Sequence, residues 1–308
     1  MQADQTSPEN TAAPLAVGSQ PRKKRSQMHE VWRRFRKSVT GMVGLTIMVL
    51  LVALALSADI IAPAYGASPG YDIQNLDNTF QPPSWEHPFG TDNFGRDILS
   101  RVAHGARISL QVGFVVVSIS MVAGVTLGAI SGFFSGISDN FIMRIIDILL
   151  AIPNILLAIA IASALRPGIL SVMIAVGVSS IPGYARIVRA SVLSLREQEF
   201  VEAARAGGAS SFHIITRHIL PNCMAPIIVQ ATMGMAVAIS MAASLSFIGI
   251  GISPPVPEWG AMLAESRRFI RDHGHMVFFP GAAIALVIFG LNMMGDGLRD
   301  AFDPRLKK

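Results

Sequence analysis

Charged residues are missing from six long stretches of this chain, and that pattern dominates its sequence. Each stretch is close to or above the roughly 18 residues that an apolar helix needs to cross a bilayer. A helix also satisfies its own backbone hydrogen bonds where no water is available. We therefore expect an all-α membrane protein with six transmembrane helices, formed by residues 38–58, 108–138, 148–165, 167–185, 219–257 and 276–295.

The composition agrees with this interpretation. Of the 308 residues, 51% are hydrophobic and only 15% are charged, whereas soluble domains carry about 25% charged residues. The net charge is +5, but the Lys and Arg residues flank the apolar stretches instead of covering one folded polar face. That distribution argues against a nucleic-acid partner.

The Lys and Arg residues also predict the orientation. If both termini are cytoplasmic, 18 of the 25 lie on the cytoplasmic side and 7 on the other. This bias satisfies the positive-inside rule. The polar segment between the fourth and fifth stretches is then cytoplasmic as well.

The segments outside the apolar stretches complete the predicted organisation. Residues 1–27 are polar and lack apolar periodicity, which is typical of a disordered tail. Residues 28–63 combine a basic interfacial helix, suited to contact with membrane lipid, with the first transmembrane helix. We divide the chain into a cytoplasmic tail (1–27), this basic and spanning segment (28–63), an extracytoplasmic segment (64–106), a five-helix core (107–300) and a cytoplasmic tail (301–308).

A polar island at residues 195–222 separates the fourth and fifth spans. It predicts two short helices joined by a Gly-Gly pair, since glycine supplies the left-handed conformation that stops a helix. Ser210 or Ser211 would cap the second helix, and Pro221 would end it near Ile219. Taken alone, the island is either a solvated loop or a surface that docks into a groove of another protein.

The spacing within the island favours docking. Glu202-Ala203-Ala204 is followed by three residues, then Gly208, then nine residues and a position before Ile219-Leu220-Pro221. This order resembles the EAA loop in the membrane subunits of ABC importers. His218 departs from the pattern, which has isoleucine there, and this bears on the packing of the second helix. The resemblance implies that the residues coupling the chain to an ATPase are Glu202, Ala203, Ala204, Gly207, Gly208, Ile219, Leu220 and Pro221.

Three further strings are similar to those of dipeptide, oligopeptide and nickel importer permeases. They occupy residues 89–107, 254–260 and 292–305, and the resemblance extends from about Trp32 to the C-terminus. It implies the type I ABC importer transmembrane-domain fold with cytoplasmic coupling helices. It also indicates the second-permease type, which has an extra N-terminal span.

The same resemblance implies the partners and the activity. The partners would be a sister permease, two cytoplasmic ABC ATPases that hold ATP and magnesium, and an extracytoplasmic solute-binding protein. This chain would be a non-catalytic, multi-pass permease of the bacterial inner membrane that takes up short peptides. Nickel chelates, glutathione and opines are alternative solutes for the same family.

The fifth span is the most polar of the six. Gln230, Met233, Ser240 and Ser244 lie along it, and methionine adapts readily to varied neighbours. These residues form either an adaptable core or the lining of a passage for varied solutes.

Several local features give further expectations. Asp97 is suited to cap a helix, and Pro153 would kink the third span. Arg144 and Asp147 are three residues apart at the start of that span and would pair with each other. Trp259 would lie at the membrane interface.

Catalytic and metal-binding motifs are missing from the sequence. It contains no phosphate-binding P-loop string, so ATP hydrolysis requires a separate subunit. It has one cysteine, Cys223, which rules out an internal disulfide and a cysteine-rich metal site. The alternative of a carrier that works without an ATPase would require acidic residues at mid-span, and the six stretches contain none.

Overall fold

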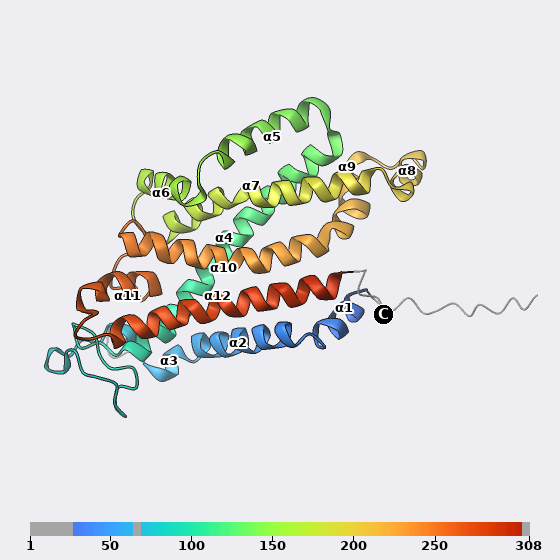
Figure 1. The fold of residues 1–308 in the computed structure, drawn as a ribbon. Helices are drawn as coiled ribbons and strands as arrows, with labels where there is room; N and C mark the ends of the chain where they lie inside the picture. The colour runs from blue at the N-terminus through green and yellow to red at the C-terminus, as the bar shows by residue number, and fades with distance from the viewer. Residues whose placement is uncertain (1–26, 64–68, 304–308) are drawn as a thin grey trace, which may run out of the picture.

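The computed structural model describes residues 27–63 and 69–303, and the regular elements in these ranges are helices (Figure 1). All but the last residue of the predicted tail at 1–27, and most of the tail at 301–308, lie outside the described residues. Five helices are long and apolar enough to cross a membrane. They comprise α2 (Val39–Leu56), α4 (Ile98–Phe134), α7 (Ile169–Arg196), α10 (Met224–Ile248), which is continuous with the segment from Ser211, and α12 (His275–Phe302).

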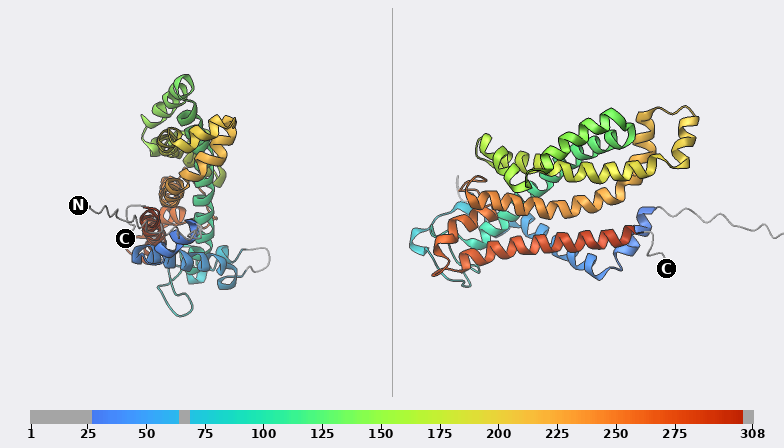
Figure 2. Two further views of the ribbon diagram at one scale, coloured as in Figure 1. Left: turned by 90° about the vertical axis from the view of Figure 1, so that its right-hand side faces the viewer. Right: turned by 45° about the horizontal axis from the view of Figure 1, so that its top comes forward.

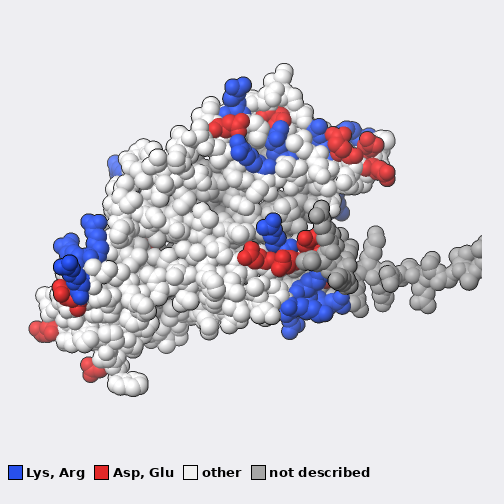
Figure 3. Space-filling model, viewed as in Figure 1, with Lys and Arg blue, Asp and Glu red and all other residues white. Residues whose placement is uncertain are grey.

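The long helices run side by side between two polar ends, with charged side chains gathered toward those ends (Figures 1–3). The end that we call the hairpin end carries the short helices α1 (Gln27–Phe35), α8 (Glu199–Ala206) and α9 (Ser211–Ile214). The C-terminus of α12 also lies there, since the Arg34 Nη1 donates to the Asp303 carbonyl at 3.4 Å.

The opposite end, the loop end, carries the extended segment 69–97 (Figure 2). Its helical elements are α3 (Ala58–Ile61), the 3₁₀ turns η1 (Gly70–Asp72), η2 (Leu76–Asn78) and η5 (Arg267–Phe269), and α11 (Trp259–Ser266). Both ends of the described chain therefore lie with the α8–α9 hairpin, as an even number of crossings requires.

The third crossing differs from the expected one. The stretch 148–165 is not one kinked helix: α5 (Gly136–Leu150) and α6 (Asn154–Ala164) meet at a bend of 90°. The pair returns the chain from the hairpin end to the loop end, and it counts as the sixth span only if both helices are taken together. Pro153 lies in the break and has no N–H to continue the α5 helix.

The expected pair of Arg144 with Asp147 is also wrong. The Asp147 Oδ1 instead accepts from the Arg186 guanidinium at 2.6 Å, and both side chains are exposed. Asp139 likewise receives two bonds from Arg189, at 2.7 and 2.6 Å. Both carboxylates of α5 therefore pair with α7, because α5 lies against the half of α7 that approaches the hairpin end.

Helix α4 begins ten residues before the uncharged stretch that predicted it. The Asp97 side chain caps it, as expected, by accepting from the Ser100 N–H at 2.7 Å. With 37 residues, α4 is about 55 Å long at 1.5 Å per residue, well beyond the roughly 30 Å hydrocarbon core. Its first turns therefore belong to the loop end.

Three glycines bring α4 and α7 into close contact. A Cβ on Gly124 would lie 2.4 Å from the Tyr184 Cβ, and one on Gly128 would lie 2.5 Å from the Ala185 carbonyl oxygen. A Cβ on Gly132 would lie 2.9 Å from the Val192 Cβ. Small residues four apart allow helix backbones to approach in a membrane, and here they fix α4 along α7 up to the hairpin end.

Candidate functional site

The α8–α9 hairpin is built from the turn chemistry that the sequence predicts. Gly207 ends α8, and Gly208 has a φ of +78°, a left-handed conformation that favours glycine. The Ala209 N–H returns to the Ala204 carbonyl at 3.1 Å, which satisfies one of the last free carbonyls of α8. Of the two candidate caps, Ser210 caps α9, accepting from the His213 N–H at 3.3 Å.

The second arm of the hairpin does not end near Ile219. A π turn, η3 (Ile215–Ile219), and a 3₁₀ turn, η4 (Leu220–Cys223), connect α9 to α10 without interruption. The Leu220 N–H donates to the Ile215 carbonyl five residues back. Pro221, at the start of η4, is thus accommodated by a change of helix type. Residues 211–248 form one helix of 38 residues.

The inner face of the hairpin is packed against its own chain. Val201, Ile214 and Ile219 are completely or almost completely buried, and Ala204 contacts the same hydrophobic cluster. The cluster is completed by α4, α7 and the start of α10, through Ala129, Phe133, Val188, Val192, Cys223 and Ile227. Burial of this much apolar surface holds the hairpin in a fixed position at the end of three long helices.

Polar contacts strengthen the same attachment. The Arg196 side chain, at the end of α7, donates to the Gly132 carbonyl at 3.2 Å and to the Ser135 hydroxyl. The Arg205 guanidinium lies 5.7 Å from the centre of the Phe133 ring, within the range of a cation–π contact. The first contacts tie the end of α7 to the end of α4, and the second ties α8 to the same end.

The opposite face of α8 is uncovered. Glu202, Ala203, Gly207 and Gly208 are exposed, and Phe200 exposes 36% of its surface. A Cβ on Gly208 would meet nothing within 4 Å. Glu199, three residues before Glu202, is exposed as well. A helix that offers small residues, one aromatic ring and two carboxylates at its surface can enter a groove of another protein closely.

The predicted coupling residues therefore fall into two groups. Glu202, Ala203, Gly207 and Gly208 lie on the exposed face. Ala204, Ile219 and Leu220 are wholly or partly buried at the base of the hairpin, while Pro221 is exposed beside the 3₁₀ turn. Two apolar residues of the second arm also differ: Phe212 is 78% exposed, whereas Ile219 is buried.

The residues predicted along a passage are likewise divided. Gln230 and Met233 line a groove between α7, α10 and the end of α12, together with Ile187, Arg299 and Phe302. Ser240 and Ser244 lie further along α10 and are half-buried. The Ser244 hydroxyl donates to the Ser240 carbonyl at 2.8 Å, so its own helix already satisfies it.

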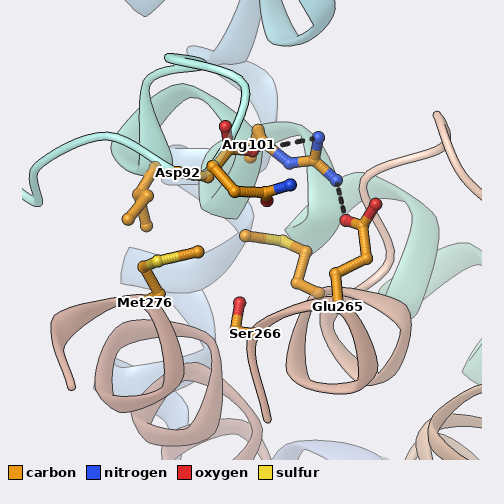
Figure 4. Close-up of a pocket in the computed structure, with 8 residues that line it drawn as sticks. Asp92, Arg101, Glu265, Ser266 and Met276 are labelled. Carbon is orange, nitrogen blue, oxygen red and sulfur yellow. Dashed lines mark hydrogen bonds and ion pairs between the residues drawn. The ribbon is translucent and has the colours of Figure 1, made fainter. Parts of the chain in front are cut away.

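The loop end contains a charged cluster that the sequence analysis did not identify. Arg96 and Arg101 are almost completely buried and meet Asp92 and Glu265. Figure 4 shows Arg101 between these two carboxylates. The Arg96 Nε lies 2.7 Å from Asp92 Oδ2, and the Arg101 Nη2 lies 3.0 Å from Glu265 Oε2. The concentration of charges around residues 92–101 was visible in the sequence, but the partner on α11 is more than 160 positions away.

Trp259 is buried and does not lie at the membrane interface as expected. Its Nε1 donates to the Val102 carbonyl at 3.1 Å, and a Cβ on Gly105 would approach its ring to 2.9 Å. The neighbouring Glu258 caps α11, accepting from the Gly260 and Ala261 N–H groups at 2.9 Å. Burial raises the pKa of the Glu258 carboxyl above its ordinary value, and the two N–H groups oppose that shift. Two of the strings noted in the sequence, 89–107 and 254–260, thus pack on each other.

The arrangement of helices matches solved ABC importers. The inward-facing MetNI methionine ABC transporter aligns with a TM-score of 0.55 at 18% identity, covering 66% of this chain and 97% of that chain. A second crystal form gives a TM-score of 0.53 at 19% identity, covering 66% and 96%. At these identities the likeness defines the fold, which is that of an ABC importer transmembrane domain.

The sequence comparisons define the family. Residues 124–308 match the binding-protein-dependent transport system inner membrane component, and residues 26–83 match the N-terminal TM domain of oligopeptide transport permease C. The dipeptide transport system permease protein DppC of Alkalihalophilus pseudofirmus is 48% identical over 282 residues, covering 92% of this chain and 91% of the relative. The glutathione transport system permease protein GsiD of Escherichia coli is 47% identical over 287 residues, covering 93% of both.

This chain therefore belongs to the binding-protein-dependent family of inner membrane transport permeases. The family resemblance and the fold predicted from the sequence are confirmed. As a permease component of an ABC system, the chain is the membrane part of the transporter, and the family assigns ATP use to partner ATPases.

Proposed function

We propose that this chain carries short peptides across the inner membrane and that the exposed face of α8 couples it to a cytoplasmic ATPase. The solute class is supported by the relatives, whose names refer to dipeptides and to glutathione, itself a tripeptide. The coupling role is supported by the uncovered face of α8 on a hairpin that is otherwise firmly packed.

The observation that carries the proposal is the continuity of the hairpin with the spans. Residues 211–248 form one helix, and only residues 197 and 198 separate α7 from α8. A force on α8 is therefore transmitted to α7 through a two-residue joint, and to α10 through the turn at residues 207–210 and the unbroken helix that follows it. Because Gln230 and Met233 lie on the same helix, movement of the hairpin displaces the groove that they line.

The coupling is thermodynamic. Closure of two ATPases on ATP would bring two docking hairpins together, one from this chain and one from a sister permease. ATP binding then shifts the permease between conformations only as far as the docking free energy of α8 differs between the ATPase states. The buried base keeps the hairpin folded, so that a force on α8 moves the attached helices and does not unfold the hairpin locally.

The proposal also sets the orientation. An ATPase is cytoplasmic, so the hairpin end faces the cytoplasm, and both termini lie on that side with it. The loop end then faces outward, where a solute-binding protein delivers the peptide. The distribution of Lys and Arg supports the same orientation.

The test uses the assembled transporter, purified with its ATPases and reconstituted in nanodiscs. Ala203→Trp and Glu202→Lys alter the exposed face without touching the buried cluster. We expect both variants to insert and assemble with the sister permease, while solute-stimulated ATP hydrolysis falls at least about tenfold, the typical effect of a disrupted interface hot spot. Normal stimulated turnover in both variants would refute the coupling role.

The matched control is Asp272→Lys, which places a lysine in place of an exposed carboxylate at the loop end, outside the segment 69–97. It should leave stimulated turnover within about twofold. The solute class is tested separately, by uptake of labelled dipeptide and glutathione into proteoliposomes in the presence of the binding protein.

A further inference from the structure

The most exposed large hydrophobic side chain among the described residues is Trp85, at 102% of its reference surface. It lies in the extended segment of the loop end, outside the long helices. Exposed apolar side chains on the long helices face lipid or neighbouring subunits, but this explanation does not extend to a polar loop. A fully exposed tryptophan is a large apolar surface without a partner in its own chain.

The loop that carries Trp85 is closed and braced. At its base, the Thr91 N–H donates to the Gln81 carbonyl at 3.0 Å and the Gln81 N–H donates to the Thr91 hydroxyl at 2.8 Å. At its tip, the Ser84 N–H donates to the His87 carbonyl at 2.8 Å. The prolines at 82, 83 and 88 restrict the backbone between these points.

The loop is also attached to α4. The His87 Nδ1 lies 2.8 Å from Asp97 Oδ2, and Asp97 caps that helix through its other oxygen. Trp85 is therefore presented from a fixed position relative to a transmembrane helix. A braced backbone and a side chain with only two rotatable bonds limit the conformational entropy lost on binding. Tryptophan is also enriched in interface hot spots.

The surroundings of Trp85 indicate a polar, water-soluble partner. Trp85, Glu86 and His87 line a groove together with Asn75 and Asn78. Residues 64–95 contain no Lys or Arg, and the exposed charges in the described part are Asp77 and Glu86. An acidic, amide-lined rim is poorly suited to anionic headgroups, and it complements a protein surface with a basic rim around an apolar pocket.

We propose that Trp85 and its groove are the anchor on which the solute-binding protein docks, with Trp85 in an apolar pocket and Glu86 against basic residues of that protein. This inference rests on the proposed function, because it takes the loop end to be the outer face. It assigns to this loop a specific part of the contact between transporter and binding protein.

The experiment measures binding of the purified binding protein to the complete transporter in nanodiscs, both nucleotide-free and trapped with a non-hydrolysable ATP analogue. We expect Trp85→Ala to weaken the affinity about 30-fold in the tighter-binding state, as for a hot-spot residue. Glu86→Lys should also weaken it, with a reduced dependence on salt. The control Ile270→Ala removes another exposed apolar side chain at the loop end and should change the affinity less than twofold.

A photo-crosslinking amino acid at position 85 identifies the occupant directly. A crosslink to the binding protein supports the inference, whereas crosslinks only to the sister permease or to lipid overturn it. Equal affinity of the wild type and Trp85→Ala also overturns it and leaves the proposed function intact. If the wild-type transporter binds no binding protein in either state, the proposed function fails as well.

Discussion

The two ends of this permease handle polar residues in opposite ways. At the loop end, Arg96 and Arg101 are buried against carboxylates of two separate segments, and Trp259 is buried beside them. At the hairpin end, Glu202 and Arg205 are exposed, and the hydrophobic cluster beneath the hairpin consists of apolar residues such as Val201 and Ile219.

This difference separates residues whose contacts are made within the chain from residues whose surface is exposed. A buried ion pair is satisfied within the chain and locks the elements that it joins, because either charge alone would be costly to bury. The exposed face of α8 has no internal partner, so its residues cost little in stability and are free to bind another subunit. The predictions below separate these two roles, from the largest expected effect to the smallest.

Arg101→Met should have the largest effect. It removes a buried guanidinium and leaves Glu265 only its longer contact with Arg96, at 3.5 Å, and breaking a buried pair typically costs about 3–5 kcal/mol. We expect a large loss of thermal stability, measured by unfolding of the detergent-solubilised transporter. The double variant Arg101→Met/Glu265→Met removes both charges and should recover most of that loss. Equal stability of Arg101→Met and the wild type would show that the cluster does not lock the loop end.

Ile219→Ala should come next, with a cost of about 2–5 kcal/mol. Ile219 is fully buried in the cluster beneath the hairpin, so its truncation leaves a cavity. Phe212→Ala, on the same arm but 78% exposed, should change stability by less than about 0.5 kcal/mol. The measurement is protease sensitivity of residues 197–222 in the assembled complex. Similar sensitivity of the two variants would contradict the division of the hairpin into a packed base and a free face.

Arg107→Met should have the smallest effect. Arg107 and Asp59 form a 3.0 Å ion pair at the loop end, but both side chains are substantially exposed. Exposed pairs contribute little to stability because solvent screens them, so the melting temperature should stay close to that of the wild type. The Arg107 guanidinium holds the pKa of Asp59 below its ordinary value. The small stabilisation is therefore present at neutral pH and is lost as the pH falls through the lowered pKa. In Arg107→Met this dependence should weaken, which acid titration of thermal stability measures.

Much of the organisation follows from the sequence. Uncharged stretches of bilayer length predicted five of the spans, because a charge in hydrocarbon is costly wherever it lies in the chain. The two arms of the hairpin followed from local chemistry, with Gly207, Gly208 and Ser210 in the predicted places. Such features depend on neighbours within a few residues, which a sequence displays directly.

Other features became clear only in the tertiary structure, because they depend on contacts between residues far apart in the sequence. The third crossing is divided into α5 and α6, and its carboxylates pair with α7. Pro221 does not end a helix, because a π turn accommodates it and packing of Ile219 holds the arm in line with α10. The pairing of Arg101 with Glu265 joins segments that only folding brings together. Sequence patterns set where the chain is apolar and where it turns, while packing and charge pairing between remote segments set which residues are locked and which stay exposed.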